Sequence, residues 1–125
     1  MNLYFYRVEL KRVIDADTMK LYFDLGFNAR LEVDVRLQGF DAPETWRPVN
    51  EGERAAGLKM TDFAKELIAS HKGNLYCRST NIDLYGRAEG ILYYKNALGE
   101  FISINVLINE HMIENHLTKD EVRKT

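Results

Sequence analysis

The stretch RLEVDVRL, residues 30–37, carries the clearest structural signal in the chain. Its apolar residues occupy every second position from Leu31 to Leu37, and a charged residue lies between each pair. This period of two is that of a β-strand with one buried and one solvent-facing side. A slip of one residue would turn the charged side chains into the core, so we expect a well-defined register.

Other segments outward from this strand have the composition of further strands and of helices. The strand candidates are residues 3–10, 18–23, 75–80 and 88–94. Helical spacing of apolar residues predicts a helix over residues 53–70, and Asn50 followed by Glu53 is typical of a helix start. Ser103 can cap a second helix. The tail from Asn115 is predicted as either a short helix or a frayed end.

Five strands with a helix between the third and the fourth predict an α+β protein. The expected architecture is an OB-type five-stranded β-barrel with two to three helices, because many short strands joined by tight turns suit a closed barrel. The length of 125 residues fits a single domain, residues 1–125. Cys77 is the only cysteine, which excludes an internal disulfide and a cysteine-based zinc cluster.

Charge and hydropathy narrow the class of protein. Lys and Arg number 17 against 19 Asp and Glu, a formal net charge of -2, which argues against a tight sequence-independent duplex binder. The net charge does not exclude an enzyme whose site holds phosphate briefly and then acts on it. No stretch approaches the roughly 20 apolar residues of a membrane span. The N-terminus lacks a signal peptide, which predicts a cytoplasmic or otherwise intracellular protein, or a secreted one whose leader has been removed.

Two acidic segments are candidates for chemistry. The first is residues 15–18, Asp-Ala-Asp-Thr, where two carboxylates can face a cation or simply form a solvated turn. The second follows the strand at residues 30–37: Asp41 and Glu44 flank Pro43, and Arg36 lies just upstream. The alternative for this segment is a charged strand face followed by an ordinary turn.

A third candidate is the turn of Tyr85, Gly86 and Arg87, which presents a guanidinium beside a phenol. Alone it is an ordinary surface turn. Together the three segments offer oxygen ligands for Ca²⁺ or Mg²⁺, guanidinium groups for phosphate and a carboxylate that can orient or deprotonate water. This is the minimum set for metal-assisted phosphodiester hydrolysis.

The order and spacing of these segments resemble the staphylococcal nuclease-like (thermonuclease) family. The matching stretches are residues 13–18, 36–44 and 83–87, with a fainter match at residues 104–105. The resemblance extends over about residues 3–117. It implies an OB-type barrel with helices packed around it, which agrees with the strand prediction.

The resemblance implies a role for each matching acidic residue. Asp17 and Asp41 are expected to bind one Ca²⁺ through their carboxylates, and Ala42 through its backbone carbonyl. Glu44 is expected to orient or deprotonate the attacking water.

The resemblance also implies phosphate-binding roles. Arg36 and Arg87 are expected to bind the scissile phosphate and stabilise the transition state, and Tyr85 to contact a phosphate of the nucleotide. Members of the family cut DNA and RNA and leave 3′-phosphate ends. Two departures from the family pattern are Ala42 in place of Thr and Leu84 in place of Lys.

The sequence therefore predicts a Ca²⁺-dependent, largely sequence-nonspecific nuclease with DNA and RNA as substrates. No membrane association and no obligate protein partner is expected. The alternative is a catalytically inactive OB-type module that binds nucleic acid or protein, because a fold does not fix a function. The presence of the whole inner set favours the enzyme; that set is Asp17, Arg36, Asp41, Glu44 and Arg87.

Overall fold

The structure is a computed structural model that describes residues 4–82 and 86–124. Within these residues the strands are β1 (Phe5–Asp15), β2 (Thr18–Asp24), β3 (Arg30–Leu37), β4 (Leu75–Ile82), β5 (Ala88–Lys95) and β6 (Phe101–Ser103). The helices are α1 (Glu51–Ala69), α2 (Ile104–Glu114) and α3 (Lys119–Val122).

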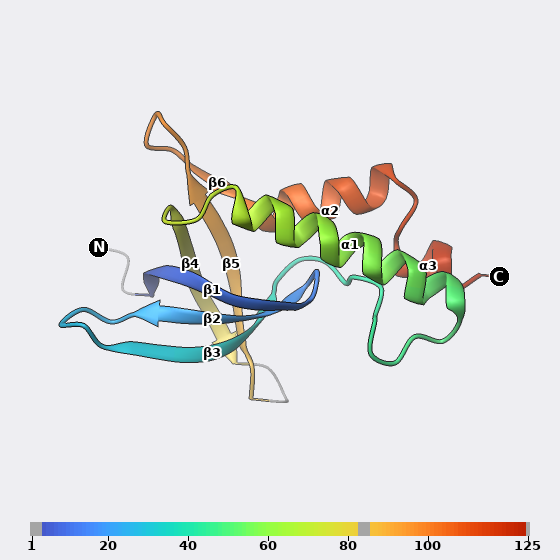
Figure 1. The fold of residues 1–125 in the computed structure, drawn as a ribbon, viewed down its shortest axis with the longest axis horizontal. Helices are drawn as coiled ribbons and strands as arrows, with labels where there is room; N and C mark the ends of the chain where they lie inside the picture. The colour runs from blue at the N-terminus through green and yellow to red at the C-terminus, as the bar shows by residue number, and fades with distance from the viewer. Residues whose placement is uncertain (1–3, 83–85, 125) are drawn as a thin grey trace.

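The strands form a closed barrel. Their hydrogen-bonded order is β3-β2-β1-β4-β5-β6, and β3 also pairs with β5, which closes the barrel through its first five strands. The β3–β5 pairing is parallel and the other pairings are antiparallel. The predicted α+β, OB-type five-stranded barrel is confirmed. Figure 1 shows the helices gathered on one side and the β2–β3 hairpin extending away on the other.

Two strands differ from the prediction. β6 was not predicted, because three residues are too few to show a period, and it adds to the edge of β5. β1 was predicted to end at Leu10 but runs on to Asp15. Two register shifts in its pairing with β2, one after Leu10 and one after Val13, break the alternation of apolar and polar residues.

Strand β3 has the predicted register, and it places Arg36 on the outside of the barrel. Val35 and Leu37 are fully buried, whereas Leu31 near the open end of the hairpin is 54% exposed. Arg36 lies opposite Thr18 on β2 and Glu89 on β5. Three strands therefore bring their outward-facing side chains together around Arg36.

The core fills the barrel and the space under the helices. From the strands it contains Val8, Val13, Met19, Leu21, Phe23, Val35, Leu37, Leu75, Cys77 and Leu92. From the helices it contains Met60, Ala64, Ile68, Ile104, Ile108 and Met112. At about 25 cal/mol per Å² of apolar surface, this burial is the main source of stability. The helices are fixed to the barrel by the same residues that fill it.

Helix α1 begins where the sequence predicts. The side chain of Asn50 accepts a hydrogen bond from the backbone N–H of Glu53 at 2.8 Å, which caps the helix. Only one side of α1 is buried, as expected for an amphipathic helix. In the described part of the chain, no helix has the length and apolarity to cross a membrane.

Candidate active site

The acidic segments singled out in the sequence meet beside the end of β3. The β1–β2 turn carries Asp17, the end of β3 carries Arg36, and the loop from Gln38 to Asn50 returns past both before α1 begins. Figure 1 shows this loop passing the β1–β2 turn on the side of the barrel that faces α3. Residues far apart in the sequence are therefore neighbours here.

Asp17 is a buried carboxylate, only 5% exposed. Its Oδ2 accepts a hydrogen bond from the N–H of Ala42 at 2.8 Å and lies 3.2 Å from a terminal nitrogen of Arg36. Its Oδ1 accepts from the hydroxyl of Thr18 at 3.0 Å. Burial nevertheless raises the pKa of Asp17 above its ordinary value, although these three groups oppose the shift. The groups around Asp17 thus compensate only part of the cost of burying its anion.

Arg36 joins the two predicted metal ligands. One terminal nitrogen faces Asp17 and also donates to the carbonyls of Leu37 at 2.8 Å and Phe40 at 2.9 Å. The other donates to Oδ1 of Asp41 at 3.2 Å. The planar guanidinium therefore fixes the start of the loop and holds both carboxylates at one place.

Glu44 is held through its backbone by a carboxylate from α1. Oε2 of Glu53 accepts from the N–H of Glu44 at 3.2 Å, and its Oε1 accepts from the N–H of Val49 at 2.8 Å. Arg123 from the end of α3 lies 3.0 Å from the same Oε2. Burial alone would raise the pKa of Glu53, but the hydrogen bonds from Arg123, Val49 and Glu44 lower it below its ordinary value.

Thr45 is held in the same way by Asp15. Oδ1 of Asp15 accepts from the hydroxyl of Thr45 at 2.7 Å and from its N–H at 3.2 Å. Each backbone N–H from Ala42 to Thr45 is thus bound by a carboxylate from another element, and Pro43 has no N–H to bind. This arrangement makes the loop rigid where Glu44 projects from it.

Gly57 on α1 lets this loop approach the helix. A Cβ at Gly57 would lie 3.0 Å from the carbonyl oxygens of Pro43 and Glu44, and 2.9 Å from a methyl group of Thr45. Helix interiors normally disfavour glycine by about 1 kcal/mol relative to alanine. Here the glycine is required by the close packing of the backbone that carries Glu44.

Lys119 places a positive charge beside the acidic residues of the loop. Its Nζ lies 3.1 Å from Oδ1 of Asp41 and 3.6 Å from Oε1 of Glu44. Its side chain is only 16% exposed, whereas that of Asp41 is 62% exposed. Asp41 therefore shares one oxygen between Arg36 and Lys119.

The donor set of this site fits a hard divalent cation such as Ca²⁺. Among the described residues, no group of three or more His, Cys, Asp or Glu side chains converges as in a ready-made metal centre. Asp17 and Asp41 nevertheless lie together on one guanidinium, and carboxylates are the ligands Ca²⁺ prefers. The incomplete compensation of the Asp17 charge is a property that a bound cation would correct.

The other predicted site residues are Ala42, Arg87 and Tyr85. Ala42 lies in the same loop, buried, with its N–H on Asp17. Arg87 precedes β5, and with Lys20 and Asp34 it lines a hollow of about 430 Å³ on the outside of β3. Arg87 therefore lies just before the strand that pairs with the end of β3. Tyr85 lies outside the described residues.

Trp46 lies in the loop just after Glu44. Its side chain is 77% exposed, so it does not anchor the loop against the barrel. An exposed aromatic ring in this loop has a free face on which a planar group can stack.

Several residues support the site in ways that the sequence shows poorly. The helix-start signal at Asn50 and Glu53 finds the cap, but Glu53 reaches beyond it to Glu44. Asn105, at the start of α2, donates to the carbonyls of Gln38 at 2.8 Å and Gly90 at 3.2 Å. It thereby ties the helix to the loop after β3 and to β5. The Lys119 contact joins residues 78 apart in sequence and has no local signal.

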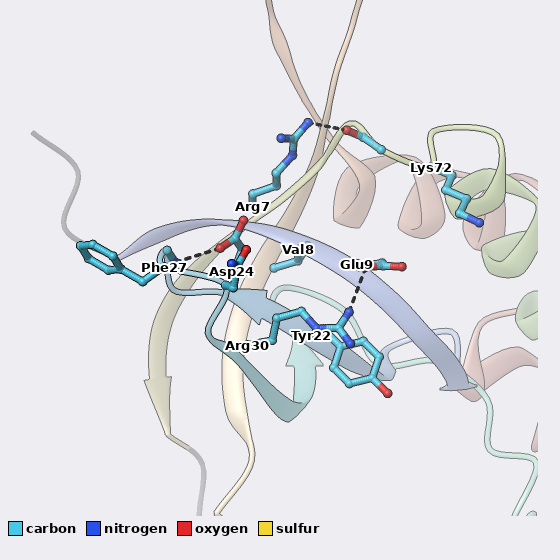
Figure 2. Close-up of a pocket in the computed structure, with 11 residues that line it drawn as sticks. Arg7, Val8, Glu9, Tyr22, Asp24, Phe27, Arg30 and Lys72 are labelled. Atoms are coloured by element: carbon cyan, nitrogen blue, oxygen red, sulfur yellow. Dashed lines mark hydrogen bonds and ion pairs between the residues drawn. The ribbon is translucent and has the colours of Figure 1, made fainter.

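A larger hollow lies at the other end of β2. It has a volume of about 620 Å³ and is shown in Figure 2. Arg30 there is paired with Glu9 at 3.3 Å, and Arg7 donates to the carbonyl of Gly73 at 3.0 Å. Phe27, at the tip of the hairpin, is fully exposed. Of the predicted site residues that the structure describes, none lines this hollow.

Comparisons with models of known protein families and with curated proteins found no match. The function is therefore inferred from the chemistry and geometry of the site.

Proposed function

We propose that the protein is a metal-dependent, largely sequence-nonspecific nuclease that hydrolyses phosphodiester bonds of DNA and RNA. The observation that carries this proposal is the position of Arg36 between Asp17 and Asp41, with Glu44 next to them in the same loop. Two potential cation ligands, a phosphate-binding guanidinium and a candidate base thus lie at one place.

Asp17 and Asp41 would hold Ca²⁺, with the carbonyl of Ala42 as a further ligand. When bound, this ion supplies positive charge that attracts the phosphate oxygens and lowers the cost of the charge that develops during attack. Each carboxylate can act as a metal ligand while it keeps its protein partners, because its two oxygens together accept several partners.

Glu44 would act on the water. Its carboxylate is 42% exposed, while its backbone is held by Glu53, so the group is both accessible and positioned. It would orient a water molecule and accept its proton as the oxygen attacks phosphorus. The bond to the 5′ oxygen then breaks, and this oxygen takes up a proton from solvent, to which Glu44 returns the proton that it accepted. The products are a 3′-phosphate and a 5′-hydroxyl. The nucleophile is water, so no 2′-hydroxyl is required and both sugars are accepted.

Arg36 would bind the phosphate with the part of its guanidinium that the protein leaves open. Its terminal nitrogens bond to Asp17, Asp41 and two carbonyls, but among residues 4–82 and 86–124 its Nε makes no hydrogen bond. An Nε–H and a neighbouring N–H form the fork that matches two phosphate oxygens. Arg87 would reach the same phosphate from the start of β5.

A plasmid cleavage assay with the purified protein tests this proposal. We expect the plasmid to be degraded with Ca²⁺ and to survive in chelator, and the products to carry 3′-phosphate ends. Plasmid that is merely retarded in a gel, and never cut with any divalent ion, would instead identify an inactive nucleic-acid-binding module.

A further inference from the structure

Within the described residues, Lys119 is the residue of α3 that forms ion pairs with the loop acids Asp41 and Glu44. Its ammonium lies within 3.1 Å of Asp41 and 3.6 Å of Glu44, and little of the side chain is exposed. Besides Arg36, the site thus contains a cationic side chain that lies in none of the three matching motifs. A lysine ammonium is a compact charge on a flexible stem, and it can leave one partner for another.

The chain on both sides of Lys119 is anchored independently of this contact. Leu117 packs against the core, and its N–H donates to the carbonyl of Met112 at 2.9 Å. Arg123 is paired with the buried carboxylate of Glu53 at 3.0 Å. The ammonium can therefore move away from Asp41 while α3 remains docked on α1.

We propose that Lys119 competes with the divalent cation for Asp41 and so sets the metal affinity of the site. This inference rests on the metal site of the proposed function. Without metal, the ammonium neutralises the two loop carboxylates. The ammonium would leave Asp41 when a divalent cation binds there, and it would then be available to a substrate phosphate.

Calorimetric titration with Ca²⁺ tests the competition directly. Removal of one unit of positive charge a few ångströms from a divalent ion should strengthen binding by about tenfold at low salt. We expect this gain for Lys119→Gln and for Lys119→Met, which keeps most of the aliphatic stem. Lys124→Gln is the matched control: it removes the same charge from an exposed position near the C-terminus and should leave the affinity within about twofold.

Labelling of the parent protein with an amine-reactive reagent gives a second readout that needs no variant. Coupling between two sites is reciprocal, so Ca²⁺ must loosen Lys119 if Lys119 weakens Ca²⁺ binding. Mass spectrometry should show slow modification of Lys119 in chelator and at least a severalfold faster one in saturating Ca²⁺. Modification of Lys124 should not change.

The outcomes separate this inference from the proposed function. If the parent binds Ca²⁺ and the Lys119 variants bind it no more tightly, the competition is overturned and the metal site stands. If neither the parent nor the variants bind Ca²⁺, both are overturned. Ca²⁺ binding by the variants alone would support the competition in its strongest form.

Discussion

At the scale of single residues, Arg36 has a structural role and, in the proposed nuclease, a chemical one. It is held by two carbonyls and two carboxylates, and it is the partner of the buried Asp17. The position is preorganised, because β3 fixes the backbone and the loop fixes the guanidinium. Charge-stabilising groups that need no reorganisation contribute most to catalysis.

Replacement of Arg36 by lysine should show that the planar fork matters. Lysine keeps the charge but cannot reach both carboxylates and both carbonyls, so we expect a loss of about 2–4 kcal/mol in the free energy of unfolding. On a short single-stranded DNA, kcat should fall by about 10³-fold. Urea unfolding and steady-state kinetics measure the two effects. Arg54→Lys, at an exposed position of α1, is the control; a similar small effect for both variants would contradict the assignment.

At the scale of elements, the loop between β3 and α1 is fixed by its surroundings rather than by its own sequence. Asp15 and Asp17 each bind one of its N–H groups, and Glu53 from α1 binds two. Helix α1 supplies Glu53, and the missing side chain at Gly57 lets the loop pack closely against the helix. The geometry of Glu44 is therefore a property of the packing between β1, the loop and α1.

Gly57→Ala should disturb the loop from the helix side. The added methyl group would meet the carbonyl oxygens of Pro43 and Glu44 at 3.0 Å, so the loop must shift. We expect a loss of about 1–3 kcal/mol in stability and a fall in kcat, although alanine favours helices. Gly52→Ala, at an exposed position in the first turn of α1, should not impair either quantity. Equal behaviour of the two variants would show that the loop has room to adjust.

Glu53 should make the stability of the loop depend on pH. Its pKa in the folded protein is lowered, so its charged form stabilises the fold above its unfolded pKa, near 4.3, and this contribution is lost as the pH falls through the folded value. Glu53→Gln should therefore be less stable than the parent at pH 7, and the difference should shrink below about pH 4. Thermal unfolding at both pH values measures it. A difference that does not change with pH would mean that shape, not charge, is what Glu53 contributes.

At the scale of the whole molecule, the barrel is what brings the site together. The parallel pairing of β3 with β5 sets Arg36 opposite Glu89, and Arg87 lies immediately before β5. Asn105 ties α2 to the same place through Gln38 and Gly90. Closure of the barrel thus positions the end of β3, which carries Arg36.

The sequence predicts the parts of this molecule that have a local period or a local cap. Residues 30–37 show their register because one face is apolar, and Asn50 shows the start of α1 because its cap partner is three residues away. β6 is too short to show a period. Lys119 reaches Asp41 across 78 residues, so only the folded chain brings them together. Asp17, Asp41 and Glu44 are candidates from the sequence because they lie next to strand ends and a proline.

Cys77 can report on the stability of the whole fold and on metal binding. Burial raises the pKa of its thiol to about 12, so the native protein should react very slowly with thiol reagents at pH 8. Reaction then requires unfolding. Ca²⁺ at about 100 times its Kd should slow the reaction by about 100-fold, because it binds only the folded state. Equal rates in Ca²⁺ and in chelator would argue against a metal site anywhere in the protein.

The most direct measurement is the cleavage rate of a single-stranded DNA oligonucleotide by the parent and by Glu44→Gln, each with Ca²⁺ and with chelator. Asp62→Asn, an exposed acid on α1, is the control for loss of a negative charge. We predict cleavage by the parent only with Ca²⁺, a rate at least about 10²-fold lower for Glu44→Gln, and a parental rate for Asp62→Asn. Cleavage that is unaffected by chelator, or a parental rate for Glu44→Gln, would contradict the assignment of this site.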